Sequence, residues 1–95
     1  MKVIFLPQAQ AELVEAIVFY EQQLKGLETV FTQELFASID LICAFPNAWQ
    51  LITKQTRKCP LYKFPYMILY GIIAGVIVVS SIAHQHRHPK SYLRN

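Results

Sequence analysis

The feature that most constrains this sequence is a run of 20 uncharged residues from Phe64 to Ala83. The run is long enough for a membrane-spanning helix, so a membrane protein is one alternative. However, Ala74-Gly75 divides it, and both arms are rich in isoleucine, valine and tyrosine, which favour strands. The pattern therefore predicts a soluble β-hairpin with strands at 66–73 and 76–84, joined by a tight turn that uses the freedom of glycine at positive φ.

Both faces of this predicted hairpin are apolar. Side chains alternate between the two faces of a strand. Regular alternation along the second strand would place Val76, Val78 and Ile82 on one face, and Ile77, Val79 and Ala83 on the other. A pair of helices can cover one face, so the second face is either closed by the chain ends or covered by a partner. We favour a partner that contributes to the cover.

The first half of the chain predicts a strand and two helices. Residues 2–6 are a short apolar run ended by Pro7, which suits the first turn of a helix. This helix ends at Lys25-Gly26, and a second one runs from about Leu27 to Phe45. Apolar side chains recur at helical spacing in both, namely Ala9, Leu13, Ala16, Ile17, Tyr20 and Leu24, then Val30, Phe31, Leu35, Ile39 and Ile42. The outer, solvated face of the first helix is expected to carry Glu12, Glu15 and Glu21.

Two short strands, at 49–53 and 57–63, are predicted between the helices and the hairpin. Pro60 within the second suits an edge or a bulge. The chain has 95 residues, which makes one small domain, 1–95, and excludes an enzyme with separate cofactor and substrate domains. The three glycines are scattered and form no phosphate-binding loop, so we expect no cofactor.

Charge is divided unevenly along the chain. Residues 1–50 carry six acidic side chains against two lysines, a net charge of −4, whereas residues 51–95 carry seven basic side chains and no acidic one, a net charge of +7. A basic half of this kind suits phosphate groups or an acidic partner. Cys43 and Cys59 form no close pair in sequence and no secretory signal is apparent, so a cytoplasmic protein with reduced thiols is expected.

Three histidines near the C-terminus raise the question of a metal site. His84, His86 and His88 would lie on one face if the strand continued, and imidazoles in this arrangement can bind zinc. No carboxylate follows Asp40 in the sequence to orient them, and Pro89 suggests that the strand has ended. We therefore expect no metal.

The basic half also carries residues that could serve a metal-independent nuclease. Its cations and tyrosines suit phosphate contact and base stacking, and they are Arg57, Lys58, Lys63, Arg87, Lys90 and Arg94, with Tyr62, Tyr66, Tyr70 and Tyr92. In such an enzyme His84 would be the general base or acid, Arg57 and Arg87 would stabilise the transition state, and Tyr92 would stack on a base or donate a proton. The alternative is that His84 caps the sheet while the arginines bind an acidic protein.

Several of these residues together resemble the RelE/ParE superfamily of type II toxins. The likeness covers nearly the whole chain and rests most on Phe64-Pro65-Tyr66-x-Ile68-x-Tyr70 and on the ending His84-x-x-Arg87-x-Pro89. Other matching positions are Ala9, Glu15, Ala16, Tyr20-Glu21, Gly26-Leu27, Phe31, Leu35, Pro46, Tyr92 and Arg94. The resemblance implies an α+β fold in which an N-terminal strand and an antiparallel two-helix hairpin pack on a twisted antiparallel sheet.

The same resemblance implies a partner and two possible targets. The partner is a cognate antitoxin that wraps the toxin in a hetero-oligomer. RelE-like members cleave mRNA on the ribosome, and for this activity the matching catalytic positions would be Arg57, His84, Arg87 and Tyr92. ParE-like members inhibit DNA gyrase without a defined catalytic set, and the Phe-Pro-Tyr strand and the His-x-x-Arg-x-Pro ending resemble this branch more. Lys58, Lys63, Lys90 and Arg94 are expected to bind the target or nucleic acid, and an inactive toxin-like binding protein is a third alternative.

Overall fold

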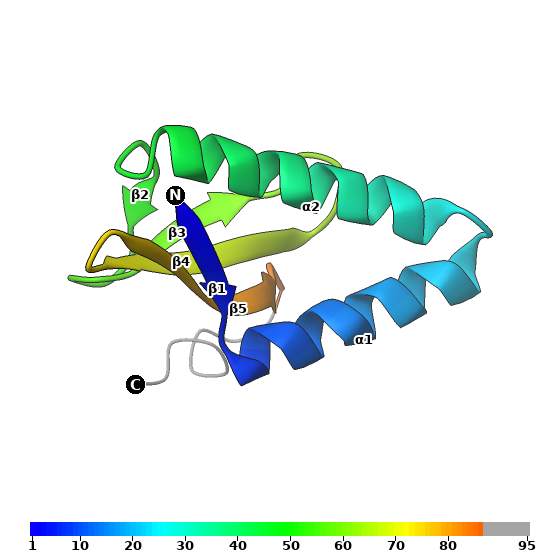
Figure 1. Cartoon of the computed structure of the whole chain (residues 1–95). Helices are drawn as coiled ribbons and strands as arrows, with labels where there is room; N and C mark the ends of the chain where they lie inside the picture. Colours follow the sequence, from blue (N-terminus) through cyan, green and yellow to red (C-terminus); the bar gives the residue numbers. More distant parts are fainter. Residues whose placement is uncertain (87–95) are drawn as a thin grey trace.

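The hairpin expected from the uncharged run is present in the computed structural model of the chain, which describes residues 1–86 (Figure 1). Strands β4 (Tyr66–Ile73) and β5 (Val76–His84) pair in antiparallel fashion. The turn residues Ala74 and Gly75 have φ values of 50° and 76°, which is the pattern of a two-residue type I′ turn. In the described part of the chain, no helix is long and apolar enough to cross a membrane. The prediction of a hairpin in this segment is confirmed.

The sheet has five strands in the order β1-β5-β4-β3-β2. The first strand, β1 (Lys2–Phe5), pairs with β5 in parallel, and the other pairs are antiparallel. One parallel pair was not anticipated in the antiparallel sheet. Between β1 and β5 the chain forms both helices and three other strands. A connection of this length allows two strands to pair in parallel.

The two strands that precede the β4–β5 hairpin in the sequence are shorter than predicted. Strand β2 (Gln50–Leu51) pairs with the first half of β3 (Arg57–Pro60), at Arg57 and Lys58. Beyond that point one side of β3 is an outer edge, which suits Pro60 because proline has no N–H to donate. The chain leaves the sheet after Pro60, so the strand predicted to reach residue 63 ends earlier.

Helices α1 (Pro7–Gln23) and α2 (Leu27–Ala44) form the predicted hairpin over one face of the sheet (Figure 1). Gly26 has a φ of 89°, the left-handed conformation that the tight connection requires. Leu24 was expected to face the core but is 65% exposed, because α1 has already ended and the chain is extended there.

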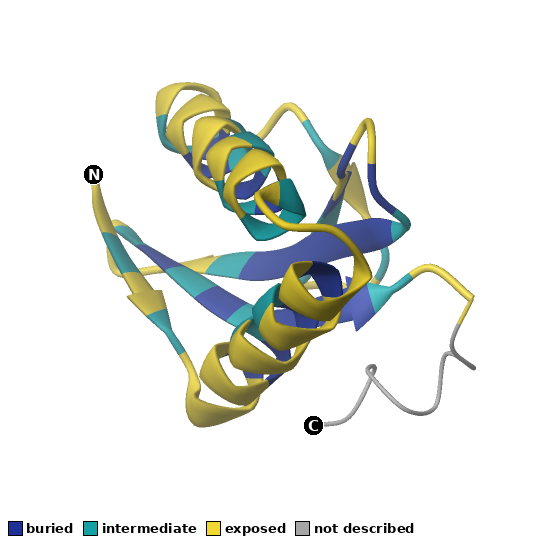
Figure 2. Ribbon diagram, turned by 90° about the vertical axis from the view of Figure 1, so that its right-hand side faces the viewer, coloured by how far each residue is buried: buried dark blue, intermediate teal, exposed yellow. Residues whose placement is uncertain are grey.

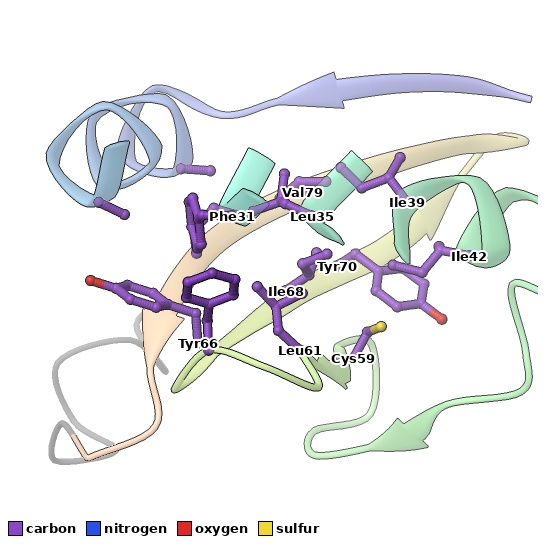
Figure 3. Close-up of a cluster of buried hydrophobic side chains, with 14 of the residues drawn as sticks. Phe31, Leu35, Ile39, Ile42, Cys59, Leu61, Tyr66, Ile68, Tyr70 and Val79 are labelled. Atoms are coloured by element: carbon purple, nitrogen blue, oxygen red, sulfur yellow. The ribbon is translucent and has the colours of Figure 1, made fainter. Parts of the chain in front are cut away.

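The core lies between the helices and the sheet. Phe31, Leu35 and Ile39 of α2 point toward Ile68 and Tyr70 of β4 (Figure 3). Tyr20 of α1 is packed against Phe31, with ring centroids 5.1 Å apart. The strand surface under the helices is buried while the outer sides of both helices are exposed (Figure 2).

A bulge in β5 changes which residues reach the core. Tyr70 pairs with Val79 and Leu69 pairs with Ser81, so Ser80 is an extra residue in β5. The extra residue shifts the alternation, and Ile82 joins the core under the helices, whereas Ala83 packs with Met67 and Leu69 in a separate cluster. The faces expected for Ile82 and Ala83 are therefore the reverse of those observed.

Glu12 is also not where the helical pattern placed it. Its side chain is 9% exposed, and Oε1 accepts hydrogen bonds from Ser81 Oγ (2.7 Å) and from the backbone N–H of Ile82 (2.9 Å). The assignment to the solvated face was wrong because the sequence of the helix does not show the polar groups that the bulge in β5 presents to it.

Candidate functional site

The second face of the sheet, away from the helices, carries a groove of about 690 Å³. Its floor includes Gly71, Val78 and Ser80, and its walls are the segment 54–57 and the hairpin end at 72–74. The remaining residues that line it are Leu6 and Leu51. Near this groove Ile52 packs on Met67, Leu69 and Ala83. The chain thus closes part of the apolar second face itself and leaves part of it open.

One wall of the groove is held against the sheet by a close backbone approach. A Cβ on Gly71 would lie 2.8 Å from the carbonyl oxygen of Gln55, so glycine is required for the loop to lie this close. Within the loop, Thr53 Oγ1 accepts from the N–H groups of Gln55 (3.2 Å) and Thr56 (3.0 Å). The wall is therefore an ordered turn with a fixed position over β4.

The groove combines apolar and basic character. Ile73 and Leu51 are 63% and 47% exposed, and Lys54 is an exposed charged residue of the lining. None of the described residues that line it is acidic. A groove of this composition suits an extended segment that alternates apolar and acidic side chains.

Arg57 has a structural role. Its guanidinium donates to the carbonyl oxygens of Trp49 (2.6 Å) and Asn47 (3.2 Å), which fixes the turn before β2. Its pairing partner Tyr70 donates through its hydroxyl to Pro46 O at 2.6 Å. Burial raises the pKa of Tyr70, an effect that the nearby Arg57 charge partly opposes. Arg57 is thus occupied by neutral carbonyl groups of its own chain.

His84 lies at the far end of β5, opposite Tyr66, and their rings meet edge to face with centroids 5.1 Å apart. Its Nδ1 accepts from the backbone N–H of His86 at 3.2 Å. These contacts match the alternative in which His84 caps the end of the sheet.

Arg57 and His84 are not brought together. On β4 their partners are Tyr70 and Tyr66, four residues apart, which in a strand is about 13 Å. The other expected catalytic residues, Arg87 and Tyr92, lie outside the described residues, as do Lys90 and Arg94. Of the four expected catalytic residues, the structure thus describes Arg57 and His84, which lie apart on the sheet.

Lys58 and Lys63, the two described residues that were expected to bind the target or nucleic acid, lie at different places. Lys58 is half-buried in β3 and pairs with Leu69. Lys63 is exposed in the loop between β3 and β4, where its backbone N–H donates to Glu34 Oε1 at 3.0 Å. Lys58 thus lies within β3, and Lys63 lies in the loop that follows it.

Neither thiol has the surroundings of a nucleophile. Cys59 is buried in the core, and burial raises its pKa to about 11, with a further contribution from the Glu34 charge. Cys43 is partly buried against the same core. Within residues 1–86, no group of three His, Cys, Asp or Glu side chains is placed to hold a metal ion.

Three residues were not given their observed structural roles from the sequence. Glu12 and Glu34 each accept hydrogen bonds from a distant strand or loop, and Gly71 admits the loop over the groove. A glycine inside a strand pattern can indicate a close backbone approach, so Gly71 could have been found. The two glutamates follow ordinary helical spacing and gave no such signal.

Known proteins resemble the chain in sequence pattern and in fold. Residues 3–89 match the family described as the ParE toxin of type II toxin-antitoxin system, parDE. A solved structure of the chromosomal ParDE TA system from P. aeruginosa is similar with a TM-score of 0.68 and 19% sequence identity, covering 88% of this chain and 95% of that chain. At this identity the likeness concerns the fold. No curated protein sequence matches the chain.

Proposed function

The chain belongs to the ParE toxin family of type II toxin–antitoxin systems, and on that basis we propose that it arrests growth by inhibiting DNA gyrase and that a cognate antitoxin neutralises it. The observation that carries the proposal is the family match over residues 3–89. Gyrase is a cytoplasmic enzyme of bacteria, so a cytoplasmic location is part of the proposal.

The arrangement of the described side chains supports inhibition by binding. Arg57 is bonded to carbonyl groups of its own chain, and on β4 its partner Tyr70 is four residues from Tyr66, the partner of His84. General acid–base catalysis needs its groups within hydrogen-bond reach of one substrate position. A surface that acts by binding has no such requirement.

The groove on the second face of the sheet is the proposed antitoxin site. Its apolar lining is complemented by the charge of Lys54, and none of the described lining residues is acidic. An antitoxin segment that is disordered alone and orders on binding can cover such a surface with apolar side chains and match its charge with carboxylates.

Gyrase inhibition is tested by DNA supercoiling with the purified protein, with and without the antitoxin encoded by the neighbouring reading frame. We expect micromolar protein to block supercoiling and the antitoxin to restore it. Full supercoiling activity at these concentrations would contradict the gyrase proposal. The same protein is added to a translation extract in parallel, where ribosome-dependent cleavage of mRNA would instead support the RelE-type alternative.

A further inference from the structure

The loop 61–65, between β3 and β4, presents one aromatic ring to solvent, while Leu61 and Phe64 of the same loop are buried. Tyr62 is 93% exposed, whereas Leu61 and Phe64 are 5% and 8% exposed. Phe64 packs edge to face on Tyr20 and Phe31, with ring centroids 4.9 and 5.2 Å apart. The loop is therefore anchored in the core on both sides of Tyr62, and the exposure of this ring does not come from a loosely attached segment.

The backbone of this loop is held a second time by Glu34 of α2, beside which it runs (Figure 1). The Glu34 carboxylate accepts from the N–H groups of both Tyr62 and Lys63, the latter at 3.0 and 3.2 Å. The loop is closed at its base by a hydrogen bond from Leu61 N to Tyr66 O at 2.9 Å. Bonds at the base and at the tip fix the direction in which Tyr62 leaves the surface.

The structure also distinguishes among the tyrosines of the basic half. Tyr66 and Tyr70 are 8% and 0% exposed, so neither can receive a planar ligand on a ring face. Tyr92 lies outside the described residues. Among residues 51–86, Tyr62 is therefore the tyrosine that is accessible for stacking.

The charge near the ring favours an anionic ligand. Lys63 is exposed next to Tyr62, and the sequence has no acidic residue from position 51 onward. Glu34, the acidic group at this loop, is engaged by two backbone N–H donors. An exposed ring beside a cation on a rigid loop is the combination by which proteins stack a base and contact its phosphate.

We propose that Tyr62 and Lys63 form a contact site for single-stranded nucleic acid, in which the phenol ring stacks on a base and the ammonium group contacts the adjacent phosphate. A duplex is a poorer ligand because its bases are already stacked on one another. Protein hot-spot residues are usually enclosed by near-neutral contacts that exclude water. Tyr62 instead is 93% exposed and is followed by the exposed Lys63, which favours nucleic acid.

The binding test uses fluorescence anisotropy with a labelled single-stranded 15-mer, as DNA and as RNA, and with the same DNA as a duplex. We expect Tyr62→Ala to weaken single-strand binding about tenfold and Tyr62→Trp to preserve it, because stacking needs a ring. Lys63→Gln is expected to weaken binding and to reduce its salt dependence. Phe45→Ala is the control, since Phe45 is a 60% exposed ring at the end of α2. It is expected to bind like the unmodified protein.

A second pair of variants tests whether the fixed loop matters. Glu34→Ala removes the acceptor for both N–H groups and is expected to speed amide exchange at Tyr62 and Lys63 and to weaken binding while the ring remains. Glu34→Gln keeps one acceptor oxygen, so its amide exchange rates and its affinity are expected to lie between those of the unmodified protein and those of Glu34→Ala. Far-ultraviolet circular dichroism and thermal unfolding confirm that each variant is folded.

Equal single-strand affinity of the unmodified protein and Tyr62→Ala would overturn the proposal, as would equal losses in Tyr62→Ala and Phe45→Ala. A poly-glutamate peptide is the competing probe. If Tyr62→Ala weakens binding of that peptide but not of the oligonucleotides, the loop is a contact for an acidic protein and the proposal is wrong. None of these measurements contains gyrase, so their outcome is independent of the gyrase proposal.

Discussion

The buried Glu12 carboxylate and the partly buried Arg57 guanidinium show how single residues hold this fold together. The Glu12 carboxylate accepts hydrogen bonds from Ser81 Oγ and the Ile82 N–H beside the bulge in β5. The Arg57 guanidinium donates hydrogen bonds to the backbone carbonyl oxygens of Asn47 and Trp49. A buried polar group that loses its partner costs about 1–3 kcal/mol, more than the bond itself contributes. These residues are thus expected to matter more for stability than exposed residues of the same kind.

Glu12→Ala is expected to lower the free energy of unfolding by about 2–3 kcal/mol, because Ser81 Oγ and Ile82 N–H lose a charged acceptor inside the structure. Urea denaturation followed by circular dichroism measures the change. Glu15→Ala, an exposed site on the same helix, is the control and should change stability by less than about 0.5 kcal/mol. Equal effects of the two substitutions would show that the buried contacts contribute nothing.

Cys59 gives the stability of the protein a pH dependence in the alkaline range. Burial raises its pKa from the model-compound value of 9.0 to about 11, so the folded state favours the protonated thiol. The contribution is fully present below pH 9 and is lost as the pH rises from 9 to 11, since the unfolded chain releases the proton first. The midpoint of urea denaturation should therefore fall over this interval, and fall less in Cys59→Ala. An identical pH profile for both proteins would contradict this assignment.

At the scale of elements, the β4–β5 hairpin depends on a turn in which one residue is poorly suited to its conformation. Ala74 has a φ of 50°, in the left-handed region where an alanine costs about 1–2 kcal/mol relative to the usual conformation. Type I′ turns favour Asn-Gly, and this chain has Ala-Gly. The long paired strands on either side hold the turn in place despite that cost.

Ala74→Gly is expected to stabilise the protein by about 0.5–1 kcal/mol, because glycine adopts positive φ without a steric penalty. The same substitution at Ala11, an exposed position inside α1, should destabilise by about 1 kcal/mol, because glycine is a poor helix former. Thermal unfolding of both variants measures the two shifts in melting temperature. Shifts of the same sign would show that the turn is not strained.

At the scale of the whole molecule, the two faces of the sheet differ in what covers them. The helix pair covers one face with the main core. The other face is partly covered by Ile52 and otherwise open as the groove between the loop 54–57 and the hairpin end. The acidic first half of the chain supplies the helices, and the basic second half supplies the groove and the loop that carries Tyr62.

Lys54→Glu is expected to weaken antitoxin binding about tenfold, because it reverses the charge at the wall of the groove where an acidic segment would lie. Isothermal titration calorimetry against the antitoxin measures the affinity. Lys25→Glu makes the same change of net charge at the exposed connection between α1 and α2 and serves as control. If both substitutions weaken binding equally, the effect is one of overall charge and the groove is not the antitoxin site.

The sequence by itself determined the parts of this protein that depend on local chemistry. The β-branched residues and tyrosines together with Ala74-Gly75 were sufficient to predict the hairpin, and helical spacing together with Gly26 was sufficient for the two helices. The family could also be named, since its pattern is spread along the chain at positions that the sequence shows directly.

Tertiary structure alone decided the contacts between distant segments. The bulge at Ser80 reversed the faces of Ile82 and Ala83, and the polar groups there drew Glu12 into the interior. Pairing with different positions of β4 placed Arg57 and His84 apart. A hydrogen bond to the Glu34 carboxylate holds the backbone of Tyr62 in place. The contacts of Glu34 and Glu12 join residues 28 and 69 positions apart. A helix or strand pattern covers about one element, so its periodicity carries no information about them.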